Sequence, residues 1–85
     1  MDFQVLAKQI LQYIGGEANI TALTHCATRL RFTLKDKAKA DAAALQKCKG
    51  VLGAVESGGQ FQVIIGSEVP KVYEMIMKIL PENTD

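Results

Sequence analysis

The sequence predicts an α+β fold in which a four-stranded, mainly antiparallel sheet is covered on one face by three helices, in the order α-β-β-α-β-β-α. Two observations support this prediction. Strand-like segments occur in two adjacent pairs, each joined by a short turn signal, as in β-hairpins. Three other segments carry apolar residues on one side only, as helices packed on a sheet do. The 85 residues suit one domain, expected over residues 1–80, with a polar tail or the start of a linker over 81–85.

The first helix is expected over residues 3–14. Its apolar residues fall at helical spacing on one face: Phe3, Leu6, Ile10 and Ile14. Asp2 can cap the amino end, and Gly15-Gly16 ends the pattern as the carboxyl end of a helix often requires.

The first predicted hairpin joins a strand over Asn19–Thr24 to a clearer strand over Thr28–Lys35. In the clearer strand, apolar and polar residues alternate. One face receives Leu30, Phe32 and Leu34, and the other receives Arg29, Arg31, Thr33 and Lys35. The connection is centred on Cys26 and Ala27, so the thiol is expected at the tip of this hairpin.

The second helix is expected over residues 38–49, which are rich in alanine. One face of this helix would carry Ala38, Ala42, Leu45 and Cys48. Asp36 is its expected cap, and Gly50 follows its last turn.

The second predicted hairpin pairs residues 51–56 with residues 60–65 through the turn Ser57-Gly58-Gly59. Along its second strand, Gln60, Gln62 and Ile64 alternate with Phe61, Val63 and Ile65. This alternation is typical of a strand with one buried face.

A last helix follows, with Ser67 as its expected cap, Pro70 in its first turn and Pro81 as its stop. Its buried stripe is expected to consist of Val69, Val72, Ile76, Ile79 and Leu80. The tail after Pro81 is polar.

Composition and charge exclude several classes of function. Hydrophobic residues make up 48% of the chain and charged residues 22%, a balance typical of globular domains. The net charge of +1 indicates no nucleic-acid partner. No apolar run reaches the roughly 20 residues of a membrane-spanning helix, so no direct membrane insertion is expected. The start of the chain lacks the basic region of a signal peptide, which favours a cytoplasmic setting with reduced thiols.

The two cysteines, Cys26 and Cys48, have different surroundings. Neither belongs to a Cys-x-x-Cys pair and only one histidine is present, so neither a metal site nor a disulfide is favoured. Cys48 falls on an apolar helix face and is interpreted as a core residue. Cys26 lies among polar residues, where core packing and a chemical role both remain open. A cysteine phosphatase is not favoured, because its arginine stands six positions after the cysteine, where this chain has Phe32.

A chemical role for Cys26 fits the residues that follow it. Nearby cations stabilise a thiolate, and Arg29 and Arg31 share a face because they are two apart on a strand. Guanidinium groups suit phosphate oxygens, and Thr28 with the N–H groups of the turn can add donors. His25 is a candidate auxiliary residue. Such an array would suit a dianionic phosphoryl group on sulfur.

The stretch NITALTHCATRLRFTLKD, from Asn19 to Asp36, resembles the phosphorylation-site signature of enzyme IIB domains of the glucose-type sugar phosphotransferase system. The signature positions are met by Asn19, Ile20, Cys26, Thr28, Arg29, Leu30, Phe32, Leu34 and Asp36. The stretch ESGGQFQVIIG, from Glu56 to Gly66, is similar to the second hairpin of that family. Together the two stretches look most like the β-glucoside, sucrose and trehalose branch.

The resemblance implies a protein-phosphohistidine–sugar phosphotransferase with a phosphocysteine intermediate. Cys26 would accept a phosphoryl group from a phosphohistidine of a IIA domain or protein. It would donate the group to a sugar bound by a membrane IIC domain. Thr28, Arg29 and Arg31 would bind the phosphoryl oxygens, and the resemblance implies no metal or other cofactor.

The resemblance also implies a setting. Residues 1–80 would form the IIB domain, at the cytoplasmic face of the cell membrane, as part of or associated with a larger permease. The sugar would be a β-glucoside or a disaccharide such as sucrose or trehalose. The alternative is a non-catalytic docking module of the same fold, acting in sugar-dependent regulation.

Overall fold

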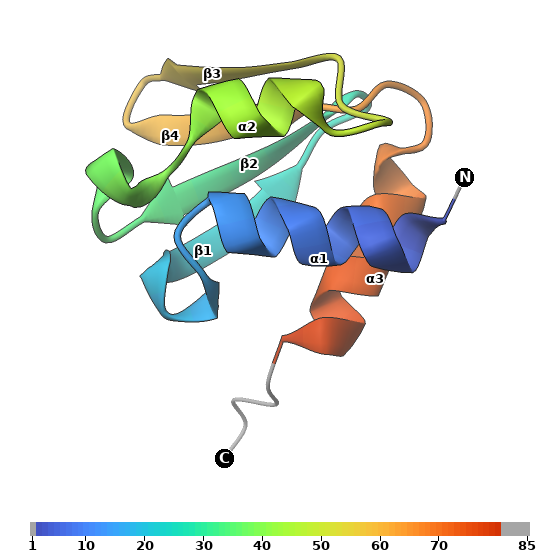
Figure 1. Cartoon of the computed structure of the whole chain (residues 1–85), viewed down its shortest axis with the longest axis horizontal. Coiled ribbons are helices and arrows are strands. Elements are labelled where there is room, and N and C mark those ends of the chain that lie inside the picture. Colours follow the sequence, from blue (N-terminus) through green and yellow to red (C-terminus); the bar gives the residue numbers. More distant parts are fainter. Residues whose placement is uncertain (1, 81–85) are drawn as a thin grey trace.

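The computed structural model describes residues 2–80 and has the predicted order of helices and strands (Figure 1). The helices are α1 (Phe3–Tyr13), α2 (Ala42–Lys47) and α3 (Val69–Ile79). The strands are β1 (Ile20–His25), β2 (Arg29–Leu34), β3 (Gly53–Ser57) and β4 (Gln60–Ile64). Two 3-10 helices, Glu17–Asn19 and Lys37–Lys39, precede β1 and α2. The predicted tail over 81–85 and the predicted stop at Pro81 lie outside the described residues.

The four strands form one sheet in the order β1-β2-β4-β3, and every neighbouring pair is antiparallel. Both predicted hairpins are confirmed, since β1 pairs with β2 and β3 pairs with β4. The second hairpin turns over Gly58 and Gly59, whose φ angles are 59° and 80°. These left-handed values are those that a tight two-residue hairpin turn requires. In the strand order given above, β2 and β4 are the two central strands of the sheet.

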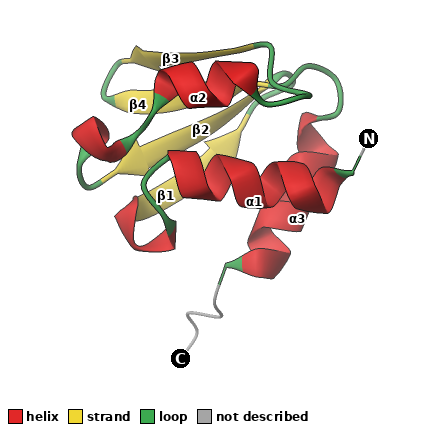
Figure 2. Cartoon of the chain, in the orientation of Figure 1, coloured by secondary structure: helices red, strands yellow, loops and turns green. Residues whose placement is uncertain are grey.

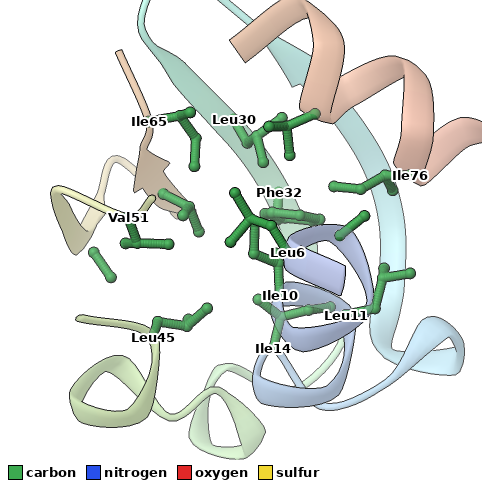
Figure 3. Packing of buried hydrophobic residues seen from close by; sticks show 14 of the residues in the cluster. Leu6, Ile10, Leu11, Ile14, Leu30, Phe32, Leu45, Val51, Ile65 and Ile76 are labelled. Carbon is green, nitrogen blue, oxygen red and sulfur yellow. The ribbon is translucent and has the colours of Figure 1, made fainter. Parts of the chain in front are cut away.

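The helices cover one face of the sheet, as predicted (Figure 2). In β2 the residues buried against the helices are Leu30, Phe32 and Leu34. Figure 3 shows Leu30 and Phe32 in a common apolar core with Leu6 of α1 and Ile76 of α3. The opposite face, here called the open face, carries the intervening residues of β2 and β4, which are half-buried, and no helix within residues 2–80 covers it. None of the helices within residues 2–80 has the length and apolar character to cross a membrane.

The limits of α1 agree with the prediction to within one residue. The carboxylate of Asp2 accepts hydrogen bonds from the backbone N–H groups of Gln4 and Val5, at 3.0 and 3.1 Å. At the other end, the N–H of Gly16 donates to the carbonyl oxygen of Leu11 at 2.8 Å. Both ends of the helix are thus satisfied by the residues expected to limit it.

The second predicted helix is wrong in length. The structure has a 3-10 helix over Lys37–Lys39 and a six-residue α2, with Ala40 in extended conformation between them. Asp36 caps the 3-10 helix through the N–H of Ala38, and a second aspartate, Asp41, caps α2. The predicted apolar face is also wrong at Ala38, which is exposed. Two aspartates that each favour a helix start divide the alanine-rich segment.

The predicted cap of the last helix is also wrong. Glu68, and not Ser67, occupies the capping position of α3, and its side chain makes no capping hydrogen bond. The backbone supplies the contacts instead, since the carbonyl oxygen of Glu68 accepts from the N–H groups of Lys71 and Val72. Pro70 lies in the first turn, as predicted. The stripe is buried at Val69, Val72 and Ile76 and partly buried at Ile79 and Leu80.

Asn19 is a buried polar residue, only 4% exposed, that joins the end of α1 to the end of β2. Its Nδ2 donates to the carbonyl oxygens of Ile14, at 2.8 Å, and Asp36, at 3.0 Å. Its Oδ1 accepts from the backbone N–H of Asp36 at 2.9 Å. A single amide therefore satisfies three backbone groups from two segments, which holds the first hairpin against α1.

Candidate functional site

The tip of the first hairpin carries the thiol, as the sequence predicts. The backbone N–H of Cys26 donates to the carbonyl oxygen of Arg29 at 3.0 Å, which closes the turn. The carbonyl oxygen of Thr28 accepts from the N–H groups of Ile65 and Gly66, both at 2.9 Å. The tip is thereby bound to the residues that follow β4, at the centre of the sheet.

The thiol of Cys26 is free, partly exposed and surrounded by hydrogen-bond donors. Its pKa is lowered to about 7, chiefly by the backbone N–H of Thr28. The backbone N–H of Arg29, the hydroxyl of Thr28 and the charge of Arg31 lower this pKa further, against the opposing effect of desolvation. Donors directed at sulfur stabilise the anion, so a large share of Cys26 is thiolate near neutral pH.

Arg31 lies on the open face of the sheet, on the side away from the helices. Arg31 lies opposite Thr24 of β1 on one side and opposite Gln62 of β4 on the other. Its charge acts on the Cys26 thiol. Its Nε is buried and has no hydrogen-bond partner among the described residues. A buried donor without an acceptor is costly in a folded protein, so this nitrogen suits an acceptor oxygen supplied by a bound group.

Arg29 shares the open face with Arg31, as predicted, but its side chain is held by a residue that the sequence did not indicate. Nη1 of Arg29 donates a hydrogen bond of 2.8 Å to Oε1 of Gln62 on β4. The structure thus brings the backbone of Arg29 to the thiol while Gln62 engages its guanidinium. The alternation of Gln60 and Gln62 with apolar residues was the signal available in the sequence, and it placed Gln62 on the polar face without naming its partner.

His25 lies on the other face of the hairpin from the two arginines. It lies directly opposite the buried Leu30 of β2. Because opposite residues of two paired strands point to the same face, His25 faces the helices. Its ring centroid is 4.4 Å from that of Tyr73 on α3, and its Nδ1 is 3.0 Å from the carbonyl oxygen of Cys26. The residue predicted as an auxiliary is therefore placed to hold the tip of the hairpin against α3.

The second cysteine has the surroundings of a core residue. Cys48 is buried, and its Sγ donates to the carbonyl oxygen of Ala44 at 3.5 Å. Burial raises the pKa of the Cys48 thiol, opposite in sign to the shift at Cys26. Within residues 2–80 no group of three or more His, Cys, Asp or Glu side chains is placed to hold a metal ion.

Cys26 is partly exposed and lines neither of two grooves in the described structure. One groove of the described structure lies between α1 and α2, and another lies between β1 and the end of α3. Neither groove includes a residue of the hairpin tip. Both grooves thus lie away from the partly exposed Cys26.

Alkylation of Cys26 by iodoacetamide is expected to rise with pH around a midpoint of about 7, since the thiolate is the reactive form and its pKa is lowered to that value. The rate can be followed by intact mass in a Cys48→Ala variant, which leaves one thiol. A short peptide spanning the hairpin tip is the unfolded reference, with an expected midpoint of about 8.5. Equal midpoints in the protein and the peptide would contradict the stabilised thiolate.

A sequence profile of the family "phosphotransferase system, EIIB" matches residues 8–41, which contain the whole hairpin tip. Three curated relatives align with most of the chain. The β-glucoside-specific EIIBCA component of Bacillus subtilis (strain 168) is 54% identical over 78 residues, and the sucrose-specific EIIBC component of Staphylococcus xylosus is 50% identical over 80. The trehalose-specific EIIBC component of Bacillus subtilis (strain 168) is 48% identical over 73 residues.

These alignments cover 92%, 93% and 85% of this chain but only 13%, 17% and 16% of the respective relatives. The chain thus spans about a sixth or less of the length of these proteins. The crystal structure of one domain of the PTS system IIabc component from Clostridium difficile superposes with a TM-score of 0.85 at 37% sequence identity. That superposition covers 91% of this chain and 81% of the crystallised chain.

Proposed function

The chain belongs to the EIIB family of the phosphotransferase system, and from that premise we propose that it is the phosphocarrier domain of a sugar permease, with Cys26 carrying the phosphoryl group. The observation that carries the proposal is the partly exposed Cys26 thiol, whose pKa is lowered to about 7 by donors of its own turn. The same donors suit the oxygens of a phosphoryl group on sulfur.

The chemistry consists of two displacements at phosphorus. In the first, the Cys26 thiolate attacks a phosphohistidine of the IIA partner, the N–P bond breaks and an S–P bond forms. In the second, a sugar hydroxyl held by the IIC partner attacks phosphorus, an O–P bond forms, the hydroxyl proton passes to a base outside this chain, the S–P bond breaks and the thiolate leaves. A thiolate serves both steps because it is a good nucleophile and a good leaving group.

The residues around Cys26 supply positioning and charge, which is most of what phosphoryl transfer asks of a protein. The N–H groups of Thr28 and Arg29 and the hydroxyl of Thr28 would donate to phosphoryl oxygens. Arg31 would supply positive charge and the buried Nε donor, and Arg29 a planar fork of donors. No step of this scheme requires a metal ion or a nucleotide.

The names of the relatives support a setting for the domain. They are β-glucoside-, sucrose- and trehalose-specific components designated EIIBCA or EIIBC. Residues 1–80 would accordingly be the IIB domain, residues 81–85 a polar tail or the start of a linker, and IIA and IIC the partners. The domain would work at the cytoplasmic face of the membrane within or beside a larger permease, and its sugar would be a β-glucoside or a related disaccharide.

The test is phosphorylation of the 85-residue chain by phosphoenolpyruvate, enzyme I, HPr and a matched IIA, measured by intact mass. The expected result is the gain of one phosphoryl group that depends on IIA. Binding to IIA without any gain in mass would favour the docking module over the carrier. Release of phosphate from an aryl phosphate by the chain alone would instead favour a phosphatase.

A further inference from the structure

The open face of the sheet places a glutamine against the arginine of the signature. Nη1 of Arg29 donates to Oε1 of Gln62 at 2.8 Å, and the contact is partly buried. The two residues are 33 apart in the sequence, so the fold and not the local chain creates the contact. Such a hydrogen bond restricts a long side chain that would otherwise sample many rotamers in water.

The pairing of β2 with β4 fixes the position of this contact. Arg29 lies opposite Ile64, and Arg31 lies opposite Gln62. Arg29 and Gln62 are therefore diagonal neighbours on one face of an antiparallel pair, a separation that long side chains bridge. Because both strands are central in the sheet, the contact does not depend on a loop or on an edge strand.

An amide holds a guanidinium without cancelling its charge. A carboxylate at the same place would form a charge-assisted pair, roughly twice as strong, and would compete with phosphate for the same donors. The ion pairs within residues 2–80 are Lys37–Glu56 and Lys71–Glu68, so neither arginine of the open face has an acidic partner in that range. Gln62 thus holds one terminal nitrogen of Arg29 without placing a negative charge beside the guanidinium.

The two arginines therefore have different tasks. The charge of Arg31 acts on the Cys26 thiol, whereas Arg29 acts on it through a backbone N–H. The guanidinium of Arg29 is held at one terminal nitrogen by Gln62, which limits the orientations of its remaining N–H groups. Orientation of donors matters in phosphoryl transfer, where alignment accounts for much of the catalysis.

We propose that Gln62 is a positioning residue for phosphoryl transfer, whose side-chain oxygen orients the guanidinium of Arg29 so that its free donors meet the phosphoryl oxygens on Cys26. The role rests on the proposed function, because it requires that Cys26 carries the phosphoryl group. Gln62 contacts neither the sulfur nor the phosphorus in this role and acts through Arg29.

The test replaces Gln62 with methionine, which has a similar size but no amide oxygen. The rate of sugar phosphorylation is measured with membranes carrying the matched IIC and with IIA, HPr, enzyme I and phosphoenolpyruvate. Gln62→Met is expected to lower the rate of sugar phosphorylation about tenfold or more, because this is the effect of losing one hydrogen bond to a charged group. Gln60→Met is the matched control, on the same strand and face but opposite Ser57, and is expected to leave the rate unchanged.

A double-mutant cycle separates positioning from a general effect on folding. In an Arg29→Lys background, Gln62→Met is expected to cause no further loss, because lysine lacks the planar fork that Gln62 orients. Gln62→Glu is expected to slow the reaction of the otherwise unchanged chain, since its carboxylate would pair with Arg29. Urea unfolding of each variant establishes that it is folded under the assay conditions.

The outcomes are distinguishable. An unchanged rate in Gln62→Met would overturn the role of Gln62 while leaving the carrier function intact. The role of Gln62 would also be overturned if Gln62→Met lowered the rate of sugar phosphorylation equally in the unsubstituted chain and in the Arg29→Lys variant. Failure of the unsubstituted chain to take up a phosphoryl group would overturn the proposed function, and the role of Gln62 with it.

Discussion

Replacing Cys26 with serine is expected to abolish phosphoryl transfer, with a loss of about a thousandfold or more in sugar phosphorylation, the order that removal of a covalent nucleophile costs. The hairpin tip lowers the pKa of the thiol to about 7, so the unsubstituted protein has thiolate available near neutral pH. A serine hydroxyl stays protonated under these conditions, and its alkoxide is a poorer leaving group than a thiolate. Both displacements at phosphorus are therefore impaired.

The matched control is Cys48→Ala, because both variants remove one thiol from the same chain. Cys48 is buried against α2, so its replacement is expected to change stability and not transfer. The measurement is sugar phosphorylation in the complete system, together with the intact mass of each variant after incubation with the donor proteins. Retention of a covalent phosphoryl group by Cys26→Ser, or its loss in folded Cys48→Ala, would contradict the assignment of the carrier residue.

Replacing Asn19 with alanine is expected to lower the free energy of unfolding by about 3 kcal/mol, because each buried polar group left without a partner costs on the order of 1–3 kcal/mol. The substitution would leave unpaired the carbonyl oxygens of Ile14 and Asp36 and the N–H of Asp36. It would also release the contact between the end of α1 and the end of β2. No apolar side chain at this position can supply these hydrogen bonds.

Urea unfolding followed by circular dichroism measures this effect, with Gln12→Ala as the control. Gln12 is also an amide residue and lies in α1, but it is exposed, so its replacement is expected to change stability by less than about 0.5 kcal/mol. A similarly small change for Asn19→Ala would show that the buried hydrogen bonds do not hold the two segments together.

The same contacts give a structural reason for the first and last positions of the signature, which are Asn19 and Asp36 in this chain. In this structure Asn19 and Asp36 meet at the base of the hairpin, and the thiol is at its tip. The side chain of Asp36 also caps the 3-10 helix after β2. These two positions of the signature thus support the base of the hairpin, and the positions Leu30, Phe32 and Leu34 between them belong to the apolar core.

The strands and the two hairpins were predictable from the sequence because their signals are local. The alternation of apolar and polar residues along β2 and the adjacent glycines 58 and 59 are enough to predict the strands and hairpins. The second helix was mispredicted because alanine favours helix throughout the segment, whereas Asp41 begins a new helix within it. Its N–H also donates to the carbonyl oxygen of Tyr13 at 2.7 Å, a tertiary contact that no local pattern reveals.

The site was predictable in its composition and less so in its arrangement. Cys26, Thr28 and the two arginines were expected to converge because a tight turn and a period of two bring them together. The contact between Arg29 and Gln62 depends on β2 lying beside β4, a strand order that local sequence patterns do not predict. The position of His25 against Tyr73 depends in the same way on how α3 packs.

The carbonyl oxygen of Thr28, which accepts from both Ile65 and Gly66, makes those two amides natural spectroscopic probes. These two residues follow β4, far along the chain from Cys26, yet the N–H of each donates directly to the turn that holds the sulfur. Any change in the polarisation of that turn would alter the chemical shifts of both amides together. Under the proposed function, an isotope-labelled sample would thus report phosphorylation of Cys26 in real time, with no tag near the reacting atoms.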